Sequence, residues 1–168
     1  PSAVTDKIML SEKVFAYNIG TGELLWQHDG AGIPNISLAI ADGRVFFLKD
    51  DVESEEREQA RAAIQTEIDG GNYVPEREQK LAEKDRDVRR VVCLEAASGR
   101  ELWSRPYDLT GCGGTKLGIA YQDGRLLFFG HYSNHDEGPF NKGDLNWRRI
   151  TVLQSESGSL LWSKPLNY

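Results

Sequence analysis

Short apolar runs, separated by turn-forming pairs, recur along this sequence. Val14–Tyr17 alternates between more and less apolar side chains, as a half-buried strand does. Asp-Gly pairs precede two strongly apolar runs, at residues 42–48 and 123–129. Because Asp-Gly favours a tight turn and Gly tolerates positive φ, each pair predicts a hairpin between a short strand and a longer one. The pattern therefore predicts an all-β fold of antiparallel hairpins.

A second pattern repeats at longer range. Residues 16–26, 93–103 and 152–162 align without gaps, and each segment has Gly four positions before Trp and Leu immediately before Trp. Three of the four tryptophans of the chain fall in this register. The recurring residues are Gly22, Trp26, Gly99, Trp103, Gly158 and Trp162. Each segment is typical of a strand, a glycine turn and a returning strand.

Combining the two patterns gives a four-stranded antiparallel meander. One copy occupies residues 33–107 and another 108–168, while residues 1–32 hold an incomplete copy with strands expected at 7–10, 14–18 and 23–27. Repeated four-stranded sheets with periodic glycine and aromatic residues are typical of propeller blades. We therefore expect a β-propeller fragment of four-stranded antiparallel blades, part of a propeller of roughly six to eight blades.

The tryptophan segments resemble the repeat of pyrroloquinoline quinone-type (quinoprotein) propellers, which reads Ala-x-Asp-x-x-Thr-Gly-x-x-x-Trp. In the first segment Ala16, Thr21, Gly22 and Trp26 agree with this pattern, and Asn18 replaces Asp. The other two segments keep the Gly and the Trp. The resemblance implies that each Trp packs against the neighbouring blade as a tryptophan-docking motif.

Two insertions interrupt the blades, and both fall between a second and a third strand, so both lie on one face. The first, at about residues 50–90, is dense in charge and has strong helix formers at 53–63. A break at Gly70–Asn72 and a second helix over 76–87 would make it a helical hairpin with a narrow apolar stripe that includes Val52 and Ala60. It is either a solvated decoration or an interaction arm or lid. The second, at about 131–147, reads as an irregular loop.

Candidate chemistry is sparse. His131, His135 and Asp136 could supply metal donors, but the Gly-Pro step that follows favours a solvated loop. The glycine-rich stretch 111–114 lacks the Lys-Ser/Thr of a phosphate loop and is interpreted as a link between blades. Cys93 and Cys112 are expected to be a buried strand thiol and a loop thiol without a bridge.

The net charge and the apolar runs of the chain limit the classes of partner that it could bind. The net charge of −6 and the pI near 5.1 argue against nucleic acid. No apolar run approaches the roughly 20 residues of a membrane helix. No signal peptide is visible, and the initial Pro1 suggests excision from a longer protein.

The sequence is therefore compatible with two functions. The first is a non-catalytic scaffold or a protein- or ligand-binding surface, with no catalytic residue and no cofactor or metal. Its partners would be the remaining blades, another copy through open blade edges, or a protein at the helical insertion. The alternative is a segment of a pyrroloquinoline quinone-dependent dehydrogenase, with calcium, whose active site lies largely outside these residues. The resemblance implies a periplasmic or cell-surface location.

Overall fold

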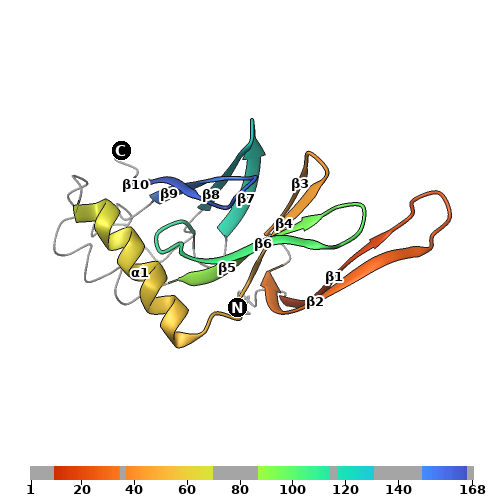
Figure 1. Cartoon of the computed structure of the whole chain (residues 1–168), viewed down its shortest axis with the longest axis horizontal. Helices are drawn as coiled ribbons and strands as arrows, with labels where there is room; N and C mark the ends of the chain where they lie inside the picture. The colour runs from red at the N-terminus through yellow and green to blue at the C-terminus, as the bar shows by residue number, and fades with distance from the viewer. Residues whose placement is uncertain (1–9, 35–36, 70–86, 114–116, 131–148, 166–168) are drawn as a thin grey trace, which may run out of the picture.

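The structure, a computed structural model, describes residues 10–34, 37–69, 87–113, 117–130 and 149–165. These residues form strands and one helix (Figure 1). The elements are β1 (Leu10–Tyr17), β2 (Leu24–Pro34), β3 (Leu38–Ala41), β4 (Arg44–Lys49), α1 (Ser54–Asp69), β5 (Val88–Glu95), β6 (Glu101–Asp108), β7 (Leu117–Gln122), β8 (Arg125–Gly130), β9 (Arg149–Gln154) and β10 (Leu160–Pro165).

The strands form three antiparallel sheets in chain order. β1 and β2 make a two-stranded sheet, and two four-stranded meanders follow, with the orders β3-β4-β5-β6 and β7-β8-β9-β10. The sheets succeed one another along the molecule, and their hairpin turns splay apart like blades (Figure 1). β3 lies against β7, so the first strands of the two complete sheets approach each other. This confirms the predicted all-β succession of four-stranded meanders.

The two Asp-Gly turns are the tight turns that the sequence predicts. Asp42 and Gly43 have φ of 48° and 69°, and Asp123 and Gly124 have 47° and 75°. Positive φ at both central residues defines a type I′ turn, whose twist matches that of the flanking strands. Both turns therefore have the backbone that their sequence favours.

Some predicted boundaries were wrong. Leu10 was expected to end a strand separate from that of Val14, but β1 runs continuously through both. Its partner β2 extends to Pro34, well beyond the predicted end at residue 27, and the pairing shifts register between Ser11 and Lys13. The long partner strand, rather than local composition, therefore decides the length of β1.

The first insertion contains the predicted first helix, α1, between β4 and β5. Most of the predicted second helix lies outside the described residues, and Asp87, its expected last residue, is not helical. The second insertion lies between β8 and β9 and is likewise outside them. Both insertions therefore link a second to a third strand, as expected. In the described part of the chain, no helix is long and apolar enough to span a membrane.

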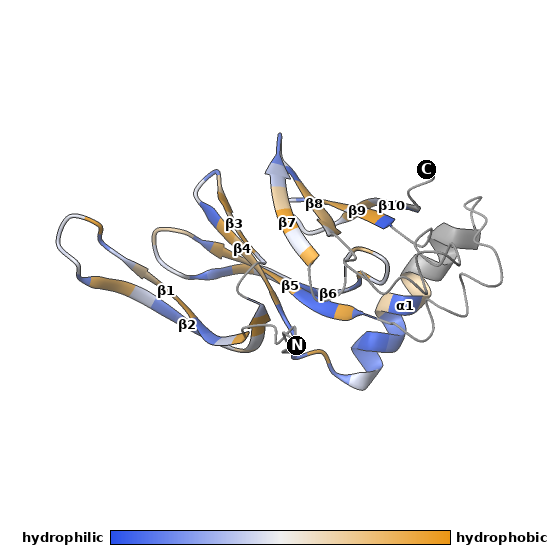
Figure 2. Ribbon diagram, turned by 180° about the vertical axis from the view of Figure 1, so that it is seen from behind, coloured by the Kyte–Doolittle hydropathy of each residue, from blue (hydrophilic) through white to orange (hydrophobic). Residues whose placement is uncertain are grey.

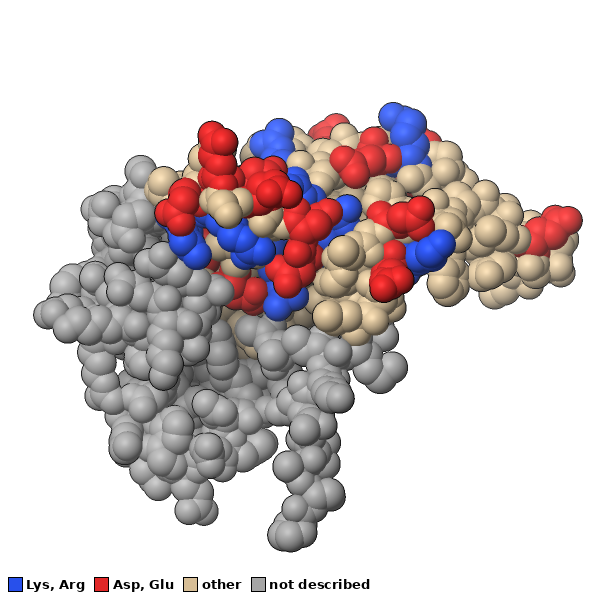
Figure 3. Space-filling view, turned by 90° about the horizontal axis from the view of Figure 1, so that it is seen from below, with Lys and Arg blue, Asp and Glu red and all other residues tan. Residues whose placement is uncertain are grey.

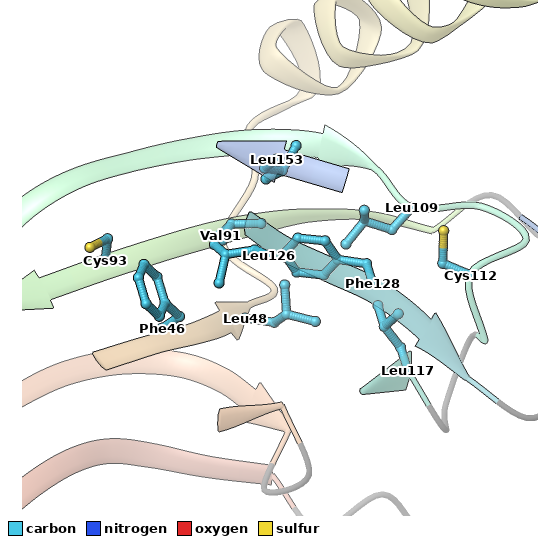
Figure 4. Packing of buried hydrophobic residues seen from close by; sticks show 10 residues of the cluster. All are labelled: Phe46, Leu48, Val91, Cys93, Leu109, Cys112, Leu117, Leu126, Phe128 and Leu153. Carbon is cyan, nitrogen blue, oxygen red and sulfur yellow. The ribbon is translucent and has the colours of Figure 1, made fainter. Parts of the chain in front are cut away.

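The main core fills the space between the two complete sheets (Figure 4). Phe46 and Leu48 of β4 lie against Leu126 and Phe128 of β8, and all four are fully buried. In Figure 2 the apolar residues lie on the strands, among hydrophilic stretches, and the coloured part of α1 is largely hydrophilic. A smaller core joins the first two sheets and consists of Val14, Trp26, Ile33, Val45, Phe47, Val92 and Leu94. Burial between successive sheets thus holds the blades together.

Phe46→Ala tests this core. Removing a fully buried ring between two sheets should lower the free energy of unfolding by about 3–5 kcal/mol, because lost transfer energy and a residual cavity add. Ile40→Ala on the neighbouring strand, where the side chain is 68% exposed, should change it by less than about 0.5 kcal/mol. Urea denaturation measures both, and equal effects would contradict the described core.

Candidate functional site

Trp26 on β2 makes the contact between the first and second sheets. Its indole Nε1 donates a hydrogen bond to the carbonyl oxygen of Ala96 at 2.8 Å. The ring lies directly over Gly99, in the turn between β5 and β6, where an added Cβ would be 2.6 Å from Cδ2 of the indole. Only glycine leaves room for the ring, so the turn acts as a seat for the indole.

Trp103 on β6 makes the same contact with the third sheet. Its Nε1 donates to the carbonyl oxygen of Ser155 at 3.0 Å, and a Cβ at Gly158 would lie 2.9 Å from Cε3 of the ring. The Tyr107 hydroxyl also donates to the carbonyl oxygen of Gly158. Phe46 packs beside Trp103 at a ring-centroid distance of 6.2 Å. The two interblade contacts therefore share an indole seated on a glycine turn and bonded to its backbone.

A β-bulge precedes each of the three tryptophans. In β2, Trp26 pairs with Ala16 and Leu24 pairs with Tyr17, so Leu25 has no partner in the ladder. The same irregularity leaves out Leu102 before Trp103 and Leu161 before Trp162. An extra residue locally re-aims the strand. The invariant Leu-Trp pair is therefore a bulge, a role that sequence reasoning did not assign to the leucine.

Among the described residues, the Gly22 turn and Trp162 do not make an interblade contact of this kind. In the described part of the chain nothing lies within 4 Å of a Cβ built at Gly22, and the Ile19 residue in the same turn is fully exposed. Trp162 is half-buried, with Lys164 Nζ 5.8 Å from its ring centroid. One seat and one indole therefore remain at opposite ends of the row of sheets.

His28 lies in the interface between the first two sheets. Its ring packs edge-on against Phe47 at a centroid distance of 5.6 Å, and its Nε2 is buried without a hydrogen-bond partner. Desolvation, with the Lys49 charge as the second cause, lowers the pKa of His28 from its usual 6.5. The interface therefore favours neutral His28.

Both cysteines are buried and free of disulfides. Burial raises the pKa of Cys93 to about 11 and that of Cys112 to about 12. Cys112, expected as a loop thiol, lies fully buried with Sγ 3.3 Å from Thr151 Oγ1. The loop is drawn inward because the Gly113 backbone approaches Gly130 closely. Neither thiol has the exposure or the lowered pKa of a reactive cysteine.

The helix α1 is tied to the second sheet by two arginines. Arg57 donates to the carbonyl oxygens of Val52 at 3.0 Å and Val88 at 3.1 Å. Arg90 of β5 pairs with Glu56 at 2.5 Å and with Asp51 at 3.0 Å. Beneath these contacts the buried residues are Val52, Ala60 and Val88. Val52 and Ala60 of the predicted apolar stripe are therefore buried, whereas Ala63 is exposed.

The predicted loop site lies outside the described residues. His131, His135 and Asp136 all fall between β8 and β9, in a segment that the structure does not describe. Within the described ranges, no three His, Cys, Asp or Glu side chains gather as metal ligands. The loop site therefore stays a prediction.

Among the described residues, no tryptophan face and disulfide of adjacent cysteines come together as in the quinone sites of the quinoprotein family. Such a site stacks the cofactor between a tryptophan face and a disulfide of adjacent cysteines. The two cysteines of this chain are far apart in sequence and both are free. The Trp26 and Trp103 rings are occupied in interblade contacts.

No protein-family profile and no curated protein matches the sequence. Among solved structures, a europium-containing methanol dehydrogenase is similar with TM-score 0.46 and 14% identity, over 90% of this chain and 21% of that chain. BamB from Moraxella catarrhalis is similar with TM-score 0.48 and 12% identity, over 93% and 31%. The chain thus spans about a fifth and a third of these proteins.

The class of fold follows from the chain's own geometry. Four-stranded antiparallel meanders succeed one another in chain order, and the last strand of each preceding sheet seats its indole on the next sheet. This is an all-β fold of the propeller type.

Gly99→Ala should destabilise the protein more than Gly43→Ala does. Both glycines have left-handed φ, of 71° and 69°, so the backbone strain is similar, but only the Cβ at position 99 meets an indole. Overpacking should add about 1–3 kcal/mol to the loss of stability at position 99. Urea denaturation followed by tryptophan fluorescence measures the difference, and equal losses would show that the seat tolerates a methyl group.

His28 should make stability depend on pH. Because its pKa is lowered in the folded state, unfolded protein binds the proton more readily, so stability present above pH 6.5 is lost as the pH falls toward the folded-state pKa. His28→Phe keeps an aromatic ring against Phe47 and removes the titration. Thermal unfolding from pH 7.5 to 5 should show a shallower pH dependence for the variant, and parallel curves would exclude this role.

Proposed function

We propose that the chain is a non-catalytic propeller-repeat module that acts as a scaffold and presents a protein-binding surface. The observation that carries this proposal is the anchoring of α1, because Arg57 and Arg90 hold the helix against β5. A helix fixed in this way extends the rigid sheet. In this proposal the tryptophan segments serve as tryptophan-docking motifs that keep the sheets in register beneath it.

The anchored helix has two different sides. Arg90 is mostly buried beside Glu56, and hydrogen bonding to Arg90 lowers the pKa of that carboxyl group, so it stays ionised and paired. The residues that remain exposed on the first turns of α1 and just before it are Glu53, Ser54, Glu55, Glu58 and Gln59. Figure 3 shows this charged surface over α1. The sequence offered two interpretations of the insertion, and the anchoring favours an interaction arm.

The exposed acidic residues define the partner's chemistry. Glu53 and Glu55 are exposed carboxylates on a fixed backbone, suited to a basic protein surface rather than to a polyanion, whereas Glu58 is exposed but paired with Arg61 at 2.5 Å. Such exposed charges influence association rate and specificity more than affinity. The proposed partner at α1 is therefore a protein with a basic patch. The proposed location is the periplasm or the cell surface, as the family resemblance implies.

The alternative function is a segment of a quinone-dependent dehydrogenase. Its support is the repeat itself, which is an argument from fold, and one fold serves many activities. The adjacent-cysteine disulfide of that chemistry is missing from the sequence. The scaffold proposal accounts for the anchored arm, which the dehydrogenase alternative leaves without a role.

Cofactor titration separates the two functions. The purified protein is incubated with pyrroloquinoline quinone and calcium, passed through a desalting column and assayed for dye reduction with alcohols and sugars. We expect quinone absorbance to elute apart from the protein, and no dye reduction. Stoichiometric quinone retained with the protein, together with substrate-dependent dye reduction, would contradict the scaffold proposal.

A further inference from the structure

The short link between β4 and α1 lies against a bulge in β2. The ladder between β1 and β2 pairs Lys13 with Asp29 and then Ser11 with Ile33. Residues 30–32 of β2 therefore oppose a single residue of β1. A bulge bends the strand that carries it and changes where that strand points. Here it directs β2 towards the second sheet, where the chain passes into the helix.

Two glycines in this bulge allow a close approach to the link. A Cβ added at Gly30 would lie 2.7 Å from Cδ of Lys49, and one at Gly32 would lie 3.0 Å from Cβ of Asp50. The Asp50 amide donates a hydrogen bond to the Ala31 carbonyl oxygen at 3.3 Å. A larger side chain at either glycine would meet the link. The first sheet therefore rests directly on the residues that lead into α1 (Figure 1).

The same link begins a chain of ion pairs that ends on the helix. The nearly buried Lys49 places Nζ 2.9 Å from Oδ2 of Asp51. The other carboxylate oxygen, Oδ1, accepts from Nε of Arg90 at 3.0 Å. Arg90 in turn pairs with Glu56 of α1 at 2.5 Å. Asp51 is thus shared by two cations, and its position bears on how Arg90 holds the helix.

His28 lies at the start of this path, two residues before Gly30. Its ring contacts Phe47, and Lys49 is two residues further along β4 than Phe47. Among the described residues, the buried His28 Nε2 has no hydrogen-bond acceptor. Burial and the Lys49 charge both lower the pKa of His28. A proton on this ring would therefore add a second buried cation beside Lys49, with no acceptor for its N–H.

The carboxylates around His28 differ in how they could answer that charge. Glu101 of β6 and Asp29 of β2 favour protonation but are exposed, so water screens them. Asp29 is also paired with Lys13 of β1 at 3.3 Å. Asp51 favours protonation too, and it belongs to the link. The carboxylate that best answers the new charge is therefore the one that fastens the base of α1.

We propose that protonation of His28 loosens the base of α1, so that mild acid converts the interaction arm from a fixed to a mobile state. The imidazolium repels Lys49 and competes for Asp51, and the helix begins only three residues beyond Asp51. In the loosened state the ring reaches water and binds its proton more readily. Linkage then raises the population of that state as the pH falls below the ordinary pKa of 6.5.

The inference rests on the proposed function and adds its regulation. Near neutral pH, α1 offers its acidic residues on a fixed backbone. In mild acid the same residues lie on a mobile segment, and a partner must pay the entropy of ordering it. Binding of a basic protein at α1 should therefore weaken as the pH falls, and histidine is the side chain whose titration suits this range.

Spin labelling measures the mobility of the arm directly. The exposed Gln59 of α1 is replaced by cysteine and labelled with a nitroxide, and Gln122 on β7 gives a matched control label. Both native cysteines are buried, so the label attaches to the introduced thiol. Between about pH 7.5 and 5 the spectrum of the Gln59→Cys label should sharpen reversibly. The spectrum of the Gln122→Cys label should stay unchanged.

Variants of the three histidines identify the group that titrates. His28→Phe and His28→Gln are neutral at every pH, so in both the α1 label should keep its immobile spectrum in acid. His131→Phe and His135→Phe should respond as the parent protein does. Near-ultraviolet circular dichroism at pH 7.5 confirms that each variant is folded, and two substitutions at position 28 keep the test informative if one of them does not fold.

Three results would overturn the proposal. The first is an α1 label whose spectrum does not change with pH. The second is a change that persists in the folded His28 variants, which would assign it to other groups. The third is equal sharpening at both labels, which would indicate general unfolding. The measurement uses neither a partner nor a quinone, so each of these results leaves the scaffold proposal standing, and retention of quinone would not alter the mobility measured here.

Discussion

The structure depends on one interaction, an indole seated on a glycine turn of the following sheet. The contact combines a directional hydrogen bond to a main-chain carbonyl with a large apolar surface. Because the acceptor is backbone, the residues around the glycine can vary, and in the three turns only the glycine is the same throughout, with Thr21, Ser98 or Ser157 before it. The register between successive sheets is therefore set by main-chain geometry, and the apolar cores fill in around it.

Much of the fold can be read from the sequence, for physical reasons that are local. Asp42–Gly43 and Asp123–Gly124 form the tight turns that their conformational preferences favour. The alternation in β1 places Val14 inward and Phe15 outward. The glutamate- and alanine-rich run before residue 64 forms a helix. Each of these features depends on neighbours only a few residues apart, which is the range over which a single sequence is informative.

The features that the sequence did not reveal depend on distant partners. The length of β1 follows from pairing with β2 as far as Pro34, and the burial of Cys112 follows from the approach of Gly113 to Gly130. From the sequence, Arg57 and Arg90 resemble solvated charges of a charged insertion. In the structure they bind α1 to the second sheet.

The bulges before the tryptophans have a further consequence for how the protein meets its surroundings. β2, β6 and β10 are the outer strands of their sheets, and each carries its extra leucine there. A bulged margin interrupts the even row of amides and carbonyls that would otherwise recruit a foreign strand. Strand addition is thereby discouraged along the edges formed by β2, β6 and β10. The same kink that aims the indole thus also protects the strand edge that carries it.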